Sequence, residues 1–200
     1  MSLKSPHQTV AALKTAKGLK YAASEPTSIL TLASIAASES LGLDAKIITG
    51  YKTASKLLAL QQGEADLTVS PWDSMKRAEE DRQVKNLFQI GLTRDPSCPL
   101  PCLAEVASLT DSQKKLVEML FSDGKFFAAP PGVPADRIAF LKDVISKTLN
   151  DKGFQTNALA SLGAFYGYQS GEDITKYCQF LSARKAEFKL WTPLMAKHIK

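Results

Sequence analysis

Apolar residues in the N-terminal part of the chain follow two alternating patterns. Short apolar runs have the length of buried strands, and the longer segments between them repeat apolar residues at helical spacing. The predicted strands are Leu19–Ser24, Ala45–Thr49 and Ala65–Ser70, and the predicted helices are Ser5–Lys17, Ser28–Leu41 and Ala54–Gln62. A glycine follows each of these helices, at Gly18, Gly42 and Gly63. Strands that alternate with helices over short links predict an α/β fold, in which a mainly parallel sheet has helices on both faces.

The later part of the chain changes to a mostly helical pattern. A helix begins at Pro71–Asp73, a strand is predicted within Gln83–Leu92, and the proline-rich segment Arg94–Pro101 predicts a loop. The remaining predictions are helices at Thr110–Phe121, Pro134–Asn150, Phe154–Leu162 and Glu172–Leu190, strands at Lys125–Ala129 and Ala164–Tyr168, and a last helical turn or two within Thr192–Lys200. Because Ala128–Pro134 separates the two patterns, we expect one domain at residues 5–125, followed by a hinge and C-terminal helices at residues 126–200.

Composition and charge narrow the function class. The chain has 200 residues, 44% hydrophobic and 22% charged, which is enough for one sizeable core or two small lobes. The net charge of +5 is scattered, which predicts a mild preference for anions and no nucleic-acid partner, since nucleic-acid binders concentrate Lys and Arg on one face. No apolar run has the length of a membrane span. Met1–Lys4 does not begin a signal peptide, so we expect a cytoplasmic protein or a mature or truncated form.

Known catalytic and metal-binding patterns are missing from the sequence. The two histidines, His7 and His198, stand near opposite ends of the chain, and the sequence has no nucleophile elbow, Walker loop or dinucleotide fingerprint. We therefore expect no enzyme activity, no metal and no cofactor. Cys98 and Cys102 either close a small disulfide or remain two buried thiols, and Cys178 fits helix packing.

Two strand-to-helix turns are the candidate binding elements. The turns Ser24–Ser28 and Gly50–Ser55 are expected at the carboxyl edge of a parallel sheet, where ligands settle. Free backbone N–H groups at each helix start favour an anion there by about 0.3–1 kcal/mol per terminus. Hydroxyl groups on both turns either bind the ligand or cap their helices, and they belong to Ser24, Thr27, Ser28, Thr53 and Ser55.

Two further side chains near these turns have alternative interpretations. Asp66 enters a predicted strand, and it either accepts a hydrogen bond from a ligand's amino or hydroxyl group or is a surface acid. Trp72 starts a predicted helix, and it either forms an apolar wall beside a ligand or packs in the core.

Several motifs, in order, resemble one family of receptors. The helix Leu57–Gly63 followed by Ala65-Asp66-Leu67, the turn Gly50-Tyr51-Lys52-Thr53 and the segment Phe126–Pro134 are similar to its leucine-rich helix, its proline-tyrosine-lysine-glycine turn and its hinge. Ala158–Gly163 and Ser170–Asp173 continue the match. From about Thr9 to Lys200, the chain thus resembles the tripartite tricarboxylate transporter substrate-binding proteins, also called Bug receptors.

The resemblance implies a fold, a site and partners. It implies a three-layer parallel-sheet lobe of a type II periplasmic binding protein plus C-terminal helices, without the N-terminal part that builds most of the first lobe. It also implies a periplasmic receptor for a small carboxylate, with membrane transporter subunits as partners and a homodimer formed through the surface that the missing lobe leaves. The resemblance implicates Ser24, Thr27, Ser28, Thr53 and Ala54 in ligand binding, with Asp66 as a candidate for a polar substituent of the ligand. With Tyr51 and Trp72 added, these residues form the candidate ligand-binding site.

The sequence departs from this family at the two turns, and alternatives remain. Glu25 and Pro26 stand in a turn that is usually glycine-rich in the family, and Thr53 replaces a glycine. A ligand-sensing regulatory domain of the LysR effector type has similar lobes and a similar length. A hydrolase or transferase on an α/β sheet is a third interpretation, which requires a nucleophile and a base that the sequence does not show.

Overall fold

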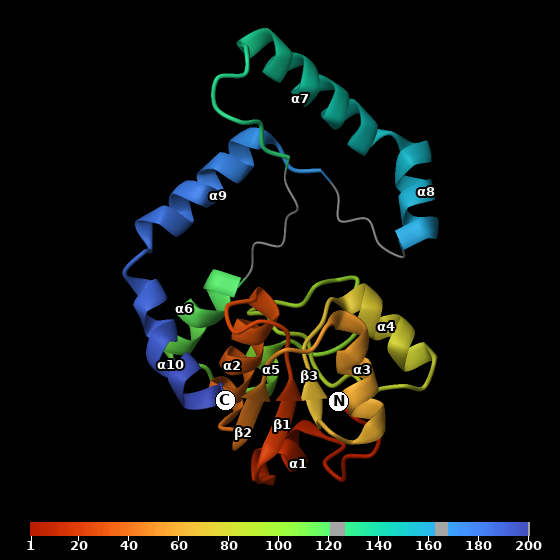
Figure 1. Ribbon diagram of the computed structural model, residues 1–200, viewed down its shortest axis with the longest axis vertical. Coiled ribbons are helices and arrows are strands. Elements are labelled where there is room, and N and C mark those ends of the chain that lie inside the picture. Colours follow the sequence, from red (N-terminus) through yellow and green to blue (C-terminus); the bar gives the residue numbers. More distant parts are fainter. Residues whose placement is uncertain (121–126, 163–167, 200) are drawn as a thin grey trace. The chain divides into compact units, whose positions relative to one another are not determined.

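The computed structural model of the chain describes residues 1–120, 127–162 and 168–199 (Figure 1). It divides into two compact units. The first comprises Met1–Phe121 with Ala186–Lys200, and the second comprises Ser122–Lys185. This differs from the division at residue 126 that the sequence predicts, because the last fifteen residues return to the first unit, where Trp191 and His198 are buried.

A three-stranded parallel sheet lies at the centre of the first unit. Its strands are β1 (Leu19–Ala22), β2 (Ala45–Ile48) and β3 (Leu67–Thr68), in the order β2-β1-β3. The register places Leu19 beside Ala45 and Tyr21 beside Leu67. The predicted α/β class is therefore confirmed, although β3 is much shorter than the predicted strand Ala65–Ser70.

Helices cover this sheet and complete the first unit. They are α1 (Val10–Thr15), α2 (Ile29–Leu41), α3 (Thr53–Gln62), α4 (Trp72–Glu80), α5 (Leu103–Val106), α6 (Asp111–Leu120), the 3₁₀ helix η1 (Glu187–Leu190) and α10 (Trp191–His198). The glycines predicted to end helices do so at α2 and α3, where Gly42 and Gly63 adopt φ of 65° and 79°. Such left-handed C-caps favour glycine, because it has no Cβ.

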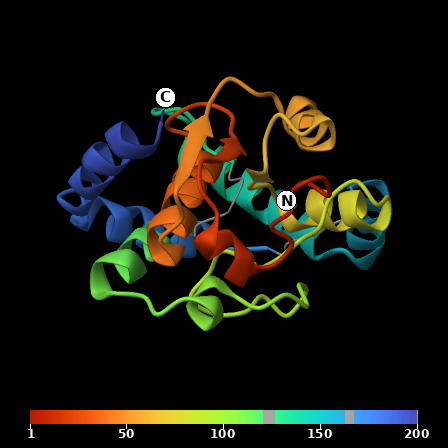
Figure 2. The ribbon, with the colours of Figure 1, turned by 90° about the horizontal axis from the view of Figure 1, so that it is seen from below.

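Two apolar clusters form the core of the first unit. The larger one joins β1 and β2 to α2, α6 and α10, with Ile35, Ile47 and Val117 fully buried. In Figures 1 and 2 α10 lies beside β2, where Ile199 forms a parallel bridge with Ile47. The smaller cluster packs α3 and α4 near β1 through Leu60, Met75 and neighbouring small residues.

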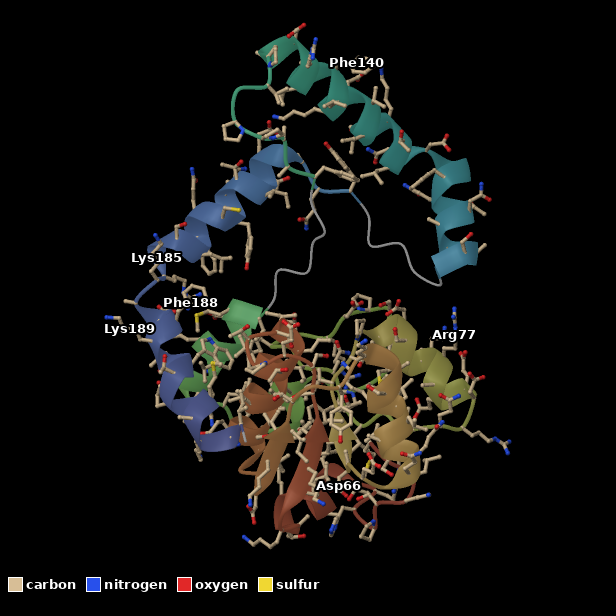
Figure 3. The ribbon with its side chains drawn as sticks, in the orientation of Figure 1. Asp66, Arg77, Phe140, Lys185, Phe188 and Lys189 are labelled. Carbon is tan, nitrogen blue, oxygen red and sulfur yellow. The ribbon has the colours of Figure 1, made fainter. Side chains whose placement is uncertain are left out.

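The second unit contains the helices α7 (Ala135–Asn150), α8 (Lys152–Leu162) and α9 (Gly171–Ala183). Lys142 on α7 and Glu172 on α9 form an ion pair at 3.5 Å. The structure describes α7 and α9 in full, and neither has a buried residue. Phe127 is 80% exposed and Phe140, on α7 (Figure 3), is 66% exposed, so this unit presents apolar surface.

Several sequence predictions are wrong in detail. Residues 83–92 form single bridges to Ser2 and Cys102 and no strand, because their partners lie on two different segments and not along one strand. The short helix α5 is missing from the predictions, and the first helix starts at Val10, four residues after Pro6. The predicted helix Glu172–Leu190 is interrupted, since α9 ends at Ala183 and η1 starts at Glu187.

Two predicted strands fall partly on residues outside the described ranges. Residues 125–126 and 164–167 are not described, while Phe127–Ala129 and Tyr168 belong to no strand. Among the helices that are described, none has the length and apolar character needed to cross a lipid bilayer.

Candidate functional site

The two turns that follow β1 and β2 lie side by side. The backbone N–H of Gly50 donates to the carbonyl of Ser24 at 2.7 Å, and that of Tyr51 donates to the carbonyl of Ala23 at 3.0 Å. Gly50 has φ of 102°, a conformation that residues with a Cβ rarely adopt. The segments Ser24–Ser28 and Gly50–Ser55 therefore meet at the carboxyl edge of the sheet, which we call the carboxyl edge below.

Three helices begin at this carboxyl edge, and their first turns differ. The Ser28 hydroxyl accepts a hydrogen bond from Thr31 N at 3.2 Å and so caps α2. The N-cap residues of α3 and α4 are Lys52 and Pro71, and neither makes a side-chain cap hydrogen bond. The first backbone N–H groups of α3 and α4 thus lack the side-chain acceptor that α2 has, and they remain donors for an anion or for water.

The sequence-predicted residues of the turns occupy this carboxyl edge in different ways. Ser24 is half-buried, Thr27 is exposed, and Ala54 is exposed in the first turn of α3. The capping interpretation holds for Ser28, whose hydroxyl also contacts the Thr31 hydroxyl at 2.9 Å. Thr53 is the first residue of α3, and its side chain lies outside what the structure describes.

The two predicted aromatic residues share one apolar cluster. Tyr51 and Trp72 are both half-buried against the smaller core cluster. The indole N–H of Trp72 donates to the carbonyl of Ser97 at 3.0 Å. Each residue combines a packed side with a partly exposed side, so both interpretations of Trp72, core and ligand wall, remain compatible with its position.

The structure separates Asp66 from the other predicted site residues. Its carboxylate accepts from Lys20 N at 3.0 Å, and its own N–H donates to the Lys20 carbonyl at 2.9 Å. Lys20 lies four residues before Ser24, which corresponds to about 13 Å along a strand. Asp66 thus lies at the amino-terminal edge of the sheet, at the foot of the strands in Figure 3, where it joins β3 to β1.

A buried lysine at the carboxyl edge was missed by sequence reasoning. Lys56 is 1% exposed, and its Nζ donates to the carbonyl of Val69 at 3.3 Å. Val69 directly follows β3, so the ammonium lies near the start of α4. The sequence signal was its spacing, because Lys56 precedes the buried Ala59 and Leu60 by three and four residues and therefore stands on the apolar stripe of α3.

A carboxylate in the first turn of α4 is incompletely bonded. Asp73 Oδ1 is buried and, within the described residues, has no hydrogen-bond partner. Acidic side chains are common in first helical turns, because they interact favourably with the helix dipole. Asp73 therefore partly offsets the positive N-terminus of α4 and leaves that of α3 as the stronger anion site.

A separate hollow of about 370 Å³ lies at the opposite, amino-terminal edge of the sheet. It is lined by α2, the start of β2 and α10, including Glu39, Lys197 and His198. The Glu39 carboxylate contacts Lys197 Nζ at 2.6 Å and His198 Nε2 at 2.5 Å. Burial alone would raise the pKa of Glu39, but the hydrogen bonds and charges of His198 and Lys197 lower it. These charges satisfy one another, so this hollow offers a ligand little unpaired charge.

The cysteine alternatives can also be compared with the structure. Cys98 and Cys102 are free and buried, and Cys178 is free and exposed. The structure thus agrees with two buried thiols in the loop before α5.

Comparisons with known proteins add a likeness in fold. No protein-family model matches the chain, and no curated protein matches its sequence. A solved structure shares the fold. It is described as R. palustris Rpa4515 with adipate, is 20% identical in sequence and has a TM-score of 0.67. The match covers 96% of this chain and 62% of that chain, so our chain spans less than two thirds of the length of Rpa4515.

At this level of identity the likeness concerns the fold alone. The shared fold contains the three-stranded parallel sheet with flanking helices, in agreement with the α/β class that the sequence predicts. The comparison provides no residue-by-residue assignment of a site, so the roles of the carboxyl-edge residues depend on their geometry.

Proposed function

We propose that the chain binds a small carboxylate at the carboxyl edge and serves as a solute-binding component of a tripartite tricarboxylate-type transporter. The observation that carries this proposal is the hydrogen-bonded pair of turns, in which Gly50 N and Ser24 O hold the start of α3 beside the start of α2. No side chain caps the start of α3, so its first backbone N–H groups lack a side-chain acceptor. Free N–H groups at a helix start are the kind of position that binds carboxylates.

Backbone N–H groups supply most of the proposed recognition. Each helix N-terminus favours a negative group by about 0.3–1 kcal/mol, and direct hydrogen bonds to the carboxylate add to this. Ser24, Thr27 and Thr53 contribute to the same carboxyl edge, with Tyr51 and Trp72 as an apolar flank. Asp66 is omitted, because it lies at the other edge of the sheet. Binding of this kind needs no chemical step, so the proposal assigns no catalytic residue.

Adipate is a suitable first ligand to test, because Rpa4515 was solved with it. Helix N-termini favour negative groups, so the two carboxylates of adipate suit this site better than the uncharged amide groups of a diamide. We expect adipate, or a related di- or tricarboxylate such as succinate or citrate, to stabilise the chain against heat. At a concentration a hundred times the dissociation constant, the gain is about 2.7 kcal/mol. Adipamide, which has the same length and no charge, is the control ligand and should give no shift.

A substitution at Ala54 tests the site itself. Ala54 is exposed in the first turn of α3, so Ala54→Asp places a fixed carboxylate where the ligand would bind. We expect this variant to fold at least as stably as the wild type, because an acid in the first turn favours the helix. It should nevertheless bind adipate at least tenfold more weakly. Ala54→Asn has the same shape without the charge and is the matched control, and equal binding by both variants would contradict the proposed site.

The proposed partners follow from the length of the chain and its exposed apolar residues. The chain spans 62% of Rpa4515, and we propose that a second copy, in addition to the transporter subunits, binds to it. The exposed Phe140, Leu141 and Val144 on α7 are the proposed contact. Sedimentation equilibrium should detect a dimer in the wild type, and Phe140→Lys should shift it to monomer. A monomeric wild type at high micromolar concentration would contradict this contact.

A further inference from the structure

The side chain of Lys56 crosses from α3 to the carboxyl edge. Lys56 stands one turn into α3, on the face that also buries Ala59 and Leu60 against the sheet. Helical side chains lean toward the N-terminus of their helix, and this direction brings the ammonium of Lys56 to the Val69 carbonyl at 3.3 Å. Nζ therefore lies among the first turns of α3 and α4, where both helices present uncapped N–H groups.

This ammonium has no counter-ion in the part of the chain that the structure describes. Within the described residues its hydrogen-bond partner is one neutral carbonyl, that of Val69, although an ammonium has three N–H donors. Desolvation by burial lowers the pKa of Lys56, and no carboxylate offsets this shift. Lys and Arg are almost never fully buried unless they are paired with an acidic group. A buried lysine near the N-termini of α3 and α4, without such a partner in the described residues, is therefore an unusual arrangement.

The other polar and charged groups on the surrounding described elements form no ion pair with Lys56. On β1, the Lys20 side chain is exposed and the Tyr21 hydroxyl interacts with Ser38 of α2. Asp66, before β3, binds the backbone of Lys20 at the opposite edge of the sheet. Asp73, on α4, forms no ion pair with Lys56. Within the described residues no carboxylate is paired with Lys56, so its ammonium is available to a negative group of a ligand.

We infer that Lys56 is the specificity-determining residue of the site and pairs its ammonium with one carboxylate of the bound ligand. This inference rests on the proposed carboxylate-binding function and adds a charged contact to it. A lysine in a site built of backbone N–H groups selects an anionic group over a neutral amide or hydroxyl, since only the anion compensates the buried charge.

The pairing predicts that ligand binding takes up a proton. A nearby carboxylate favours the ammonium and raises the pKa that burial has lowered. Between the pKa of the free protein and the higher pKa of the complex, the complex holds more protons than the free protein. In this range the affinity falls as the pH rises, whereas below the free-protein pKa Lys56 is charged in both states and no longer makes the affinity change with pH. Measurements above about pH 6.5 keep the ligand carboxylates ionised.

The test compares two lysines of the same helix start. Titration calorimetry with adipate, succinate and citrate uses the wild type, Lys56→Met and Lys52→Met. Lys52 is the exposed N-cap residue of α3, four positions earlier, and is the matched control. We expect Lys56→Met to bind the best of these acids about 10- to 100-fold more weakly, and Lys52→Met to bind it within about threefold of the wild type.

Two further readouts separate binding from a purely structural role. Titrations in buffers of different ionisation enthalpy, repeated at several pH values from about 7 to 10, measure proton uptake, which should appear within this range in the wild type and in Lys52→Met and be absent in Lys56→Met. Thermal unfolding without ligand should show Lys56→Met at least as stable as the wild type, because a desolvated charge is replaced by an apolar side chain of similar length. If Lys56→Met fails to fold, Lys56→Gln keeps a hydrogen-bond donor and replaces it in the titrations.

The outcomes distinguish this inference from the proposed function. A wild type that binds an acid as tightly as Lys56→Met does, or without proton uptake, overturns the role of Lys56 and leaves carboxylate binding intact. A wild type that binds none of the three acids overturns the proposed function and this inference together. Loss of binding in Lys56→Met, with a lower melting temperature in the absence of ligand, assigns Lys56 a structural role and also overturns the inference.

Discussion

The contact between Glu39 and His198 should hold the C-terminal helix on the first unit. His198 is the last residue of α10, and its side chain is 4% exposed. Its Nε2 contacts the Glu39 carboxylate on α2, and its Nδ1 contacts the carbonyl of Ala45 on β2 at 3.2 Å. We predict that His198→Ala and Glu39→Gln destabilise the first unit and that their effects are not additive.

The expected loss of stability follows from how deeply the His198 and Glu39 side chains are buried. A hydrogen bond to a charged group is worth about 1.5–3 kcal/mol. Glu39 is 21% exposed, so solvent screens part of this and leaves about 1–2 kcal/mol as the coupling energy. His198→Ala also loses the Ala45 contact and leaves a small void, for a total of about 2–4 kcal/mol. Glu39→Gln keeps the size of the side chain and should cost about 1–2 kcal/mol.

Urea unfolding of the two single variants and the double variant measures the coupling energy directly. Trp191 begins α10 and is buried, so its fluorescence reports on this helix. A Trp72→Phe background removes the other tryptophan and gives a single probe. Lys197→Met is the control, because Lys197 Nζ contacts the same carboxylate at 2.6 Å but its side chain is 63% exposed.

The experiment tests whether the buried contact of His198 with Glu39 contributes more to stability than the exposed contact of Lys197 with the same carboxylate. We expect less than about 1 kcal/mol for Lys197→Met, since exposed ion pairs contribute little. Additive effects of His198→Ala and Glu39→Gln, or an effect of Lys197→Met as large as that of His198→Ala, would refute the argument that the buried histidine contact docks α10.

Three other predictions concern stability. The folded-state pKa of Glu39 is depressed, so its contribution is present above the unfolded pKa and should be lost as the pH falls below about 4.5, and Glu39→Gln should flatten acid unfolding in this range. Burial lowers the pKa of the Met1 ammonium from 8.0 to about 6, so between these pH values the unfolded chain binds more protons than the folded chain. The free energy of unfolding should therefore rise with pH over this range, by roughly 2–3 kcal/mol in total. A chain with an acetylated N-terminus, checked by mass spectrometry, should lack this rise in urea titrations. Ile47→Ala empties a fully buried position on β2 and should lower stability by about 2–5 kcal/mol, measured by the same titration.

Local sequence patterns were sufficient for the sheet and its first helices. The runs that form β1 and β2 are apolar and short, and the helices between them end at glycines, so length and spacing identify each element. Residues 83–92 also contain several apolar residues but pair with two separate segments, one of which is the N-terminus. Pairing between distant segments is a property of the tertiary structure, and periodicity contains no information about it.

The candidate site was predictable only where position follows from topology. The two turns after β1 and β2 must meet at one edge of a parallel sheet, and the Gly50–Ser24 hydrogen bond shows that they do. Asp66 was grouped with them because it enters a predicted strand and matches a family motif, but the register of β3 and the hydrogen bond to Lys20 N set it at the other edge. Lys56 was overlooked because a lysine within a helix is usually solvated, and only the structure shows where its ammonium lies.

Two features at the carboxyl edge would be compensated by a bound anion, and together they support a ligand site there. A missing cap alone does not mark such a site, since α1 and α9 have side-chain N-caps from Thr9 and Ser170 whereas α7 and α10 begin without one. At the carboxyl edge, α3 and α4 lack such caps, and Lys56 is buried without a counter-ion in the described residues. A bound carboxylate would accept from the free N–H groups at the α3 start and pair with the Lys56 ammonium at once, so one ligand group would compensate both features.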